Sequence, residues 1–289
     1  MEIITTVQEM HDMVLVAREQ GKTIAFVPTM GFLHEGHLSL MTQGRKRCDL
    51  LVLSIFVNPT QFGQGEDFDS YPRNLTRDAE LAQSAGVDFI FAPTAEQMYP
   101  KGYSTTIHID GLTDNLCGAS RPGHFDGVTT VVAKLFNIVQ PHQAFFGMKD
   151  FQQLAVIQQM VRDLNMPVEV VGMPIVREQD GLAMSSRNTN LSKELRQQGL
   201  SLIDAIRQVI AAATGGENSA AALIELARQR IEQEVDASID YIQICHNQTL
   251  QDVSTIDEHS VILLAVRFGT TRLIDNHYVL QTISGSCKG

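Results

Sequence analysis

The sequence predicts an α/β fold in which a parallel sheet is followed by a second, smaller α+β domain. Through the first two thirds of the chain, short apolar segments alternate with amphipathic helical segments. Such alternation is typical of a Rossmann-like, doubly wound parallel sheet with helices on both faces. From about Leu191 the pattern changes to helical stretches followed by strand-like runs. We therefore expect one domain at residues 1–180 and a smaller one at residues 181–289.

The strands of the first domain are expected where short apolar runs are bounded by polar residues or glycine. These runs are 22–29, 49–57, 87–93, 143–147 and 168–176. Helical spacing of apolar residues predicts helices at 35–47, 76–85, 128–139 and 150–165. Ligands of such folds bind beyond the carboxyl ends of the strands, so the residues that follow each strand are the candidates for a site.

The second domain is expected to combine helices with a small sheet. Leu, Ile and Ala at helical spacing predict helices at 191–213 and 219–234, separated by TGGEN. Strand-like runs follow at 241–246, 261–268 and 271–279.

Composition and charge exclude several classes of protein. The net charge of −11, from 33 acidic and 22 basic residues, makes nucleic acid a poor partner. The longest apolar run, LLVLSIFV, is too short to span a membrane, and the N-terminal segment does not resemble a signal peptide. Cys48, Cys117, Cys245 and Cys287 form no C-x-x-C motif, which favours a reducing, cytoplasmic location and argues against a structural zinc site.

The segment PTMGFLHEGHLSL places His34 and His37 where the strand 22–29 gives way to a helix. A helix that begins near His34 brings both imidazoles to one face in its first turn, where unpaired N–H groups favour an anion. Gly31 and Gly36 leave room for a phosphate to approach the backbone. The alternatives are a metal-binding pair and histidines that only cap and pack the helix.

Amide side chains follow the strand 49–57. In NPTQFG, Pro59 and Gly63 indicate a turn, and Asn58 and Gln61 are expected to be exposed. A neutral amide can bind a carboxylate without forming the ion pair that would reduce its nucleophilicity. The alternative is an ordinary surface loop.

Cationic and hydroxyl side chains follow the last two strands of the first domain. Lys149 begins the helix 150–165, where its charge opposes the helix dipole, as expected if it meets a phosphate. Gln153 lies one turn further on the same helix. Ser185, Ser186 and Arg187 together suit the binding of phosphate.

These segments together resemble a known family. PTMG-x-LH-x-GH-x-x-L, FVNPTQF, YPR, RPGHFDGV, FG-x-KD-x-QQ, MSSRN and GTTRLIDN occur in the order found in bacterial pantothenate synthetases, over essentially the whole chain. That family belongs to the nucleotidyltransferases with an H-x-G-H signature. MSSRN stands where relatives carry a K-M-S-K-S-like phosphate loop, here without lysine.

The resemblance implies ATP-dependent ligation of (R)-pantoate and β-alanine to pantothenate. Pantoate is first converted to pantoyl adenylate with release of pyrophosphate, and β-alanine then displaces AMP. The resemblance also implies Mg²⁺ and a homodimer. Because the adenylate has to be shielded from water, we expect the C-terminal domain to close as a lid, with the loop 177–190 as its hinge.

Site residues are carried over motif by motif. His37, His34 and Lys149 are implied as catalytic, with His37 as the proton donor; Gln61 and Gln153 bind pantoate, and Gln61 also binds β-alanine. Asp78 or Asp150 is implied to hold Mg²⁺. Arg121, in RPGHFDGV, either reaches the site or is structural. ATP binding is implied for Met30, Gly31, Phe32, Leu33, His34, Glu35, Gly36, His37, Gly147, Met148, Lys149, Asp150, Val176, Met184, Ser185, Ser186 and Arg187.

Three other interpretations stay open at this point. One is another H-x-G-H nucleotidyltransferase that acts on a small carboxylate or phosphate substrate. The second is a zinc hydrolase that uses His34 and His37, for which the spacing shows no third ligand. The third is a nucleotide sensor that retains the fold without catalysis.

Overall fold

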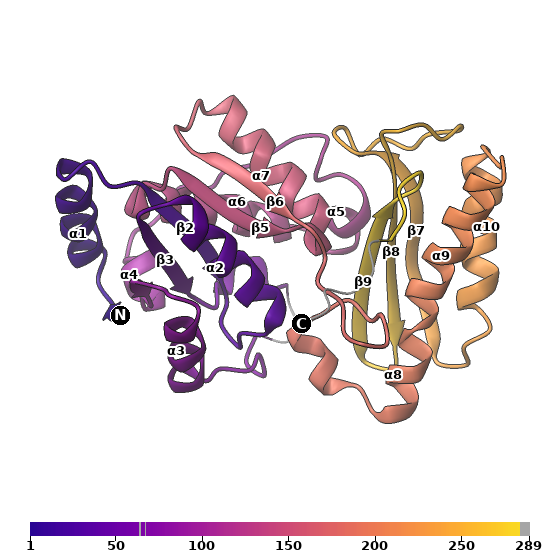
Figure 1. Ribbon diagram of the computed structural model, residues 1–289, viewed down its shortest axis with the longest axis horizontal. Coiled ribbons are helices and arrows are strands. Elements are labelled where there is room, and N and C mark those ends of the chain that lie inside the picture. Colours follow the sequence, from indigo (N-terminus) through magenta and orange to yellow (C-terminus); the bar gives the residue numbers. More distant parts are fainter. Residues whose placement is uncertain (64, 67, 284–289) are drawn as a thin grey trace. The chain divides into compact units, whose positions relative to one another are not determined.

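The computed structural model describes residues 1–63, 65–66 and 68–283 and divides into two compact units (Figure 1). The first unit comprises residues 1–148 and 153–174, and the second comprises residues 149–152 and the described chain from residue 175 onward. The boundary expected after residue 180, and the lid and hinge roles, stay predictions. Cys287 lies outside the described residues.

The first unit contains a six-stranded sheet in the order β1-β4-β3-β2-β5-β6, and every adjacent pair is parallel. This confirms the predicted α/β fold. Residues 24–27 in the middle of the sheet are fully buried, as expected for strands covered on both faces. The strands are β1 (Glu2–Ile4), β2 (Ile24–Thr29), β3 (Leu50–Ile55), β4 (Phe89–Phe91), β5 (Gln143–Gly147) and β6 (Glu169–Met173).

The helices of the first unit include every helix that the spacing predicts there. Helix α2 (Glu35–Arg47) has the predicted bounds, whereas α6 (His124–Val139) begins four residues before its predicted start at residue 128. The helices are α1 (Val7–Glu19), α2 (Glu35–Arg47), α3 (Leu75–Ser84), α4 (Ala95–Met98), α5 (Leu116–Ser120), α6 (His124–Val139) and α7 (Phe151–Asp163), whose first two residues belong to the second unit. Short 3₁₀ turns occur at η1 (Pro59–Gln61) and η2 (Met148–Asp150).

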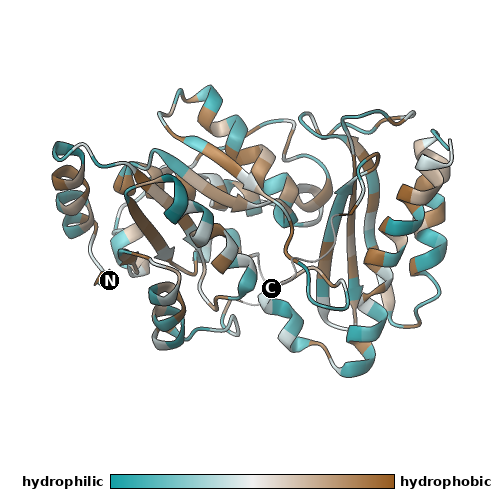
Figure 2. Cartoon of the chain, in the orientation of Figure 1, coloured by the Kyte–Doolittle hydropathy of each residue, from teal (hydrophilic) through white to brown (hydrophobic). Residues whose placement is uncertain are grey.

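The second unit packs helices against a three-stranded antiparallel sheet, ordered β7-β8-β9. Its core is built from apolar residues such as Ile206, Leu223 and Leu264, all fully buried. In Figure 2, α9 and α10 show hydrophobic and hydrophilic residues along their length, as amphipathic helices do. The elements are η3 (Ser186–Asn190), α8 (Lys193–Gly199), α9 (Ser201–Thr214), α10 (Ala220–Ile231), β7 (Ala237–His246), β8 (Ser260–Phe268) and β9 (Thr271–Tyr278).

The prediction of a single helix at 191–213 was wrong. The chain forms two helices there, α8 and α9, with a break at Leu200. At the end of α8, a Cβ atom on Gly199 would lie 3.0 Å from Leu273 Cδ1 of β9. The helix therefore approaches the sheet closely at its last residue, and this tertiary contact is not visible in the helical periodicity.

Candidate active site

The two histidines lie at the N-terminus of α2, as predicted. His34 is the N-cap residue, and its Nδ1 accepts a hydrogen bond from the backbone N–H of Gly36 (3.2 Å). The backbone N–H of His34 donates to Nδ1 of His37 (3.3 Å), which completes a capping box. The centroids of the two rings lie 4.0 Å apart.

These bonds determine where each neutral ring carries its hydrogen. A Nδ1 atom that accepts from a backbone N–H has no hydrogen of its own, so the N–H donor of each ring is at Nε2. The first turn of α2 thus places two imidazole donors at the positive end of the helix dipole. This combination suits an anion such as a phosphate.

The loop before α2 has an unusual backbone conformation. Gly31 and Phe32 both have positive φ, at 84° and 50° respectively. Asp78 of α3 fixes this loop, because its Oδ2 accepts from the N–H of Phe32 (2.7 Å) and its Oδ1 from the N–H of Leu33 (2.8 Å). A Cβ atom on residue 31 would lie 3.0 Å from both Asp78 Oδ2 and Ile55 Cγ2, so only glycine fits here.

This geometry changes the role that we assign to Asp78. Its side chain is 1% exposed, and both oxygens accept backbone hydrogen bonds. We therefore assign Asp78 to the anchoring of the loop rather than to Mg²⁺. Asp150, the other expected Mg²⁺ ligand, is exposed. Among the described residues, no group of three or more His, Cys, Asp or Glu side chains is placed to hold a metal ion.

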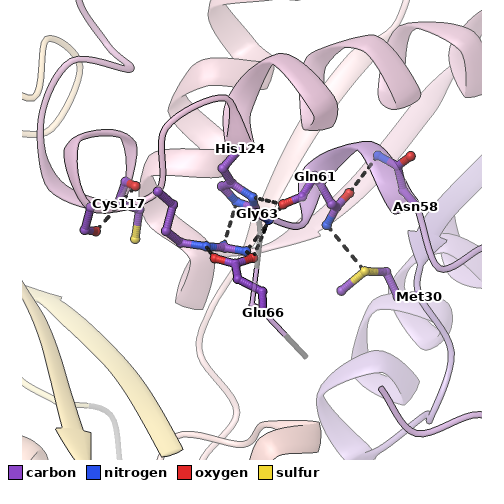
Figure 3. A network of polar contacts seen from close by, with 9 residues as sticks. Met30, Asn58, Gln61, Gly63, Glu66, Cys117 and His124 are labelled. Carbon is purple, nitrogen blue, oxygen red and sulfur yellow. Dashed lines mark hydrogen bonds and ion pairs between the residues drawn. The ribbon is translucent and has the colours of Figure 1, made fainter. Parts of the chain in front are cut away.

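The amides after β3 are buried, so the prediction that they are exposed was wrong. Asn58 is 1% and Gln61 is 9% exposed. Helix α6 covers the turn: a Cβ atom on Gly127 would lie 2.4 Å from the carbonyl oxygen of Thr60. The Gln61 carboxamide lies between Asn58 and Met30 (Figure 3), with Oε1 accepting from Asn58 Nδ2 (3.1 Å) and Nε2 donating to Met30 Sδ (3.3 Å).

The RPGHFDGV segment holds the backbone of the same turn. Arg121 forms a two-point ion pair with Glu66, with Nε–Oε1 at 2.7 Å and Nη2–Oε2 at 2.6 Å. Its Nη1 lies 3.0 Å from His124 Nε2, and His124 Nδ1 lies 2.8 Å from the carbonyl oxygen of Gln61 (Figure 3). The hydrogen bonds from Arg121 lower the pKa of Glu66 to about 2. Arg121 thus contacts the turn that carries a predicted substrate-binding residue, both directly and through His124.

The predicted site residues of the second unit lie on two segments. On the first, the carbonyl oxygen of Lys149 accepts from Asn276 Nδ2 (2.8 Å). On the second, the backbone N–H of Met184 donates to the carbonyl of Val176 (3.0 Å), and Ser185 Oγ caps η3 through the N–H of Arg187 (3.3 Å).

A buried ion pair ties the second of these segments to β9. Arg177 Nη1 and Nη2 lie 2.6 and 2.8 Å from the carboxylate of Asp275. The side chains are 10% and 2% exposed. The backbone next to Val176 is therefore fixed by a two-point contact.

The predicted residues are thus divided between the units. The first unit holds residues 30–37, Gln61, Asp78, Gly147, Met148 and the half-buried Gln153, and the second holds Lys149, Asp150 and residues 176–187. Sequence reasoning missed Glu66 and His124. His124 stood within a motif that was quoted, whereas a glutamate in a polar loop gives no signal of its own.

The parallel sheet, with paired imidazoles at the start of the helix after a central strand, defines an α/β protein of the Rossmann-like class. The family model described as "Pantoate-beta-alanine ligase" matches residues 2–278. The chain belongs to the pantoate–β-alanine ligase family.

Individual relatives agree with this assignment. The "Pantothenate synthetase" of Syntrophotalea carbinolica is 62% identical over 283 residues, which cover 98% of this chain and 100% of the relative. The crystal structure of pantothenate synthetase from Thermus thermophilus superposes with a TM-score of 0.93 at 45% identity and covers 97% of this chain and 100% of that one. A Francisella tularensis pantoate-beta-alanine ligase complexed with "Beta-gamma ATP and Beta-alanine" has a TM-score of 0.81 at 32% identity, with 98% and 99% covered.

None of the helices among the described residues combines the length and the hydrophobicity of a membrane-spanning segment.

Proposed function

We propose that this protein catalyses the ATP-dependent ligation of (R)-pantoate and β-alanine to pantothenate, releasing AMP and pyrophosphate. The family assignment over residues 2–278 supports the reaction. The observation that carries the proposed chemistry is the imidazole pair at the start of α2, with ring centroids 4.0 Å apart. A ligand-bound structure in the family, with an ATP compound and β-alanine, supports ATP and β-alanine as two of the substrates.

In the first step, a carboxylate oxygen of pantoate attacks the α-phosphorus of ATP, and the bond from that phosphorus to the bridging oxygen breaks. Pyrophosphate leaves, and pantoyl adenylate remains. Such a reaction depends on positioning and on the stabilisation of developing charge. We assign the N–H donors of His34 and His37 to the phosphate oxygens, with His37 as proton donor, and residues 30–37 to ATP binding.

The second unit supplies the cations in this proposal. Lys149 and Arg187 bind phosphate groups of ATP, together with the hydroxyls of Ser185 and Ser186. The backbone around Gly147, Met148, Val176 and Met184 completes the nucleotide site. Because additional negative charge develops on the leaving pyrophosphate as its bond to the α-phosphorus breaks, cationic side chains placed there favour the transition state over the ground state.

Mg²⁺ is compatible with this site if it binds mainly to the phosphates of ATP. Mg²⁺ in nucleotide sites is held by one or two carboxylates and the substrate phosphates rather than by a protein cage. The exposed carboxylate of Asp150 can supply one such ligand. When bound, the ion would neutralise charge on the departing pyrophosphate.

In the second step, the β-alanine amine attacks the carbonyl carbon of the adenylate, the acyl C–O bond breaks, AMP leaves, and the amine loses a proton. Gln61 and Gln153 bind pantoate through neutral amides, so the carboxylate keeps its charge for the attack. Gln61 also binds β-alanine in this scheme. We further propose a homodimer, and a cytoplasmic location that agrees with the free thiols of Cys48 and Cys245.

The proposal is tested by incubating the protein with ATP, Mg²⁺, (R)-pantoate and β-alanine and measuring the products by mass spectrometry. We expect pantothenate and AMP in equal amounts, and neither product when any one substrate is omitted. AMP formation that requires a different small carboxylate in place of pantoate would identify another nucleotidyltransferase and contradict the proposal.

A further inference from the structure

The carboxamide of Asn58 is held on both of its ends. Its Oδ1 accepts from the hydroxyl of Tyr99 (2.7 Å) and from Thr60 Oγ1 (3.0 Å). Its Nδ2 donates to the carbonyl oxygen of Gly127 (3.1 Å) and to Gln61 Oε1 (3.1 Å). Asn58 is 1% exposed, so these protein groups take the place of water.

This set of partners permits one orientation of the amide. If the Asn58 amide were flipped, its NH₂ group would face the N–H of Thr60, which lies within 3.4 Å of Oδ1. The flipped oxygen would face the carbonyl of Gly127 and the Oε1 of Gln61, which are both acceptors. Because a buried amide with mismatched partners is costly, Asn58 always presents its NH₂ group to Gln61.

The orientation of Gln61 follows from that of Asn58. Since Gln61 Oε1 accepts from Asn58, the NH₂ group of Gln61 points the other way, to Met30 Sδ (3.3 Å). A thioether is a weak acceptor, so this NH₂ group can exchange its partner for a substrate oxygen at little cost.

Tyr99 is itself held firmly. Its ring lies 5.1 Å from the ring of Tyr103, and the ammonium of Lys134 lies 5.6 Å and 4.5 Å from the centroids of Tyr99 and Tyr103. Burial raises the pKa of the Tyr99 phenol, which keeps the hydroxyl protonated as a donor. The tyrosine therefore supplies a fixed O–H group to Asn58.

We propose that Tyr99 is a positioning residue, whose hydroxyl fixes the Asn58 amide and thereby turns the N–H donors of Gln61 toward the pantoate oxygens. This inference rests on the proposed function, because it assigns pantoate as the ligand of Gln61. It adds a residue that acts through two others and does not itself touch the substrate.

The matched pair Tyr99→Phe and Tyr103→Phe tests the proposal. Both substitutions remove one hydroxyl and keep the ring beside Lys134, but the Tyr103 hydroxyl makes no hydrogen bond to Asn58 or Gln61 among the described contacts. We expect Tyr99→Phe to raise KM for pantoate about 3- to 10-fold, the equivalent of one hydrogen bond, with KM for ATP unchanged. Tyr103→Phe should leave both constants near the wild-type values.

A second measurement needs no substrate. In ¹⁵N-labelled protein, the side-chain NH₂ resonances of Asn58 and Gln61 should shift in Tyr99→Phe and stay in place in Tyr103→Phe. Unchanged resonances in Tyr99→Phe would overturn the proposed relay even if the enzyme proved inactive on pantoate. Equal rises in KM for pantoate and ATP, or equal effects of both variants, would show a general structural role and also overturn it. Absence of ligation by the wild-type protein would contradict the proposed function separately.

Discussion

The carboxylate of Asp78, in α3, accepts the backbone N–H of Phe32 at 2.7 Å, although the two residues are 46 positions apart in the chain. Phe32 has a positive φ of 50°, which is rare for a residue with a side chain. The bond therefore holds the loop that leads into the histidine pair in a conformation that it would not adopt alone.

Asp78→Asn should destabilise the protein. The amide replaces one acceptor by an NH₂ group that faces a backbone N–H, and a buried mismatch of this kind costs about 1–3 kcal/mol. Urea unfolding measures the change, with the exposed Asp114→Asn as the control. If stability were unchanged while the Mg²⁺ dependence of ATP binding was lost, Asp78 would be a metal ligand after all.

His37 contributes to both the helix cap and the proposed chemistry, and two substitutions separate these roles. Glutamine at the third helical position preserves a capping box, whereas alanine does not. We expect both His37→Gln and His37→Ala to reduce adenylate formation by roughly 10²–10³-fold, the usual effect of losing one donor at developing charge. Only the alanine variant should also lose about 1 kcal/mol of stability in thermal or urea unfolding. Near-normal activity in a folded glutamine variant would remove His37 from the catalytic residues.

Lys149→Ala should impair the first half-reaction far more than the second. The proposed ligands of Lys149 are ATP phosphates, which have left before the amine attacks. The backbone contact from Lys149 O to Asn276 is independent of the side chain, so the variant should fold. The measurement compares the full reaction with β-alanine consumption from pre-formed pantoyl adenylate. Equal losses in the two assays would mean that the side chain acts structurally.

The Glu66–Arg121 ion pair should make stability depend on pH. The pKa of Glu66 is lowered from 4.5 to about 2 in the folded protein. Because the folded pKa is depressed, the contribution of the pair is fully present above pH 4.5 and is lost as the pH falls toward 2. Unfolding free energies measured between about pH 5 and pH 2 should fall more steeply for the wild type than for Glu66→Gln. Parallel curves would show that the ion pair adds nothing to stability.

Helix α2 and strand β5 were predicted with their observed bounds, because their periodic apolar patterns end at polar residues or glycine. Strand β1, at Glu2–Ile4, was missed because only two of its residues are apolar, whereas the equally short β4 lies within the longer apolar run 87–93. Helix α1 was missed as well, although Thr6 caps it through the N–H of Glu9 (3.2 Å). Local pattern alone thus recovered most of the sheet but not the edge strand β1.

Local sequence pattern also predicts only part of the candidate site. The positions of His34 and His37 followed from the strand-to-helix sequence. The burial of Asn58 did not, because it depends on α6, which begins 66 residues later and packs on the turn through Gly127. The anchoring role of Asp78 also depends on a contact between distant segments. Such contacts are set by tertiary packing and leave no local signal in a single sequence.

The central claim is that this site activates the carboxylate of pantoate as an adenylate. Exchange of ³²P-labelled pyrophosphate into ATP tests it most directly, because exchange requires reversible formation of that intermediate. We expect exchange that depends on (R)-pantoate, proceeds without β-alanine, and falls by about 10²-fold or more in His37→Gln. No exchange by a folded, ATP-binding protein in the presence of pantoate, or exchange that does not require pantoate, would contradict the account.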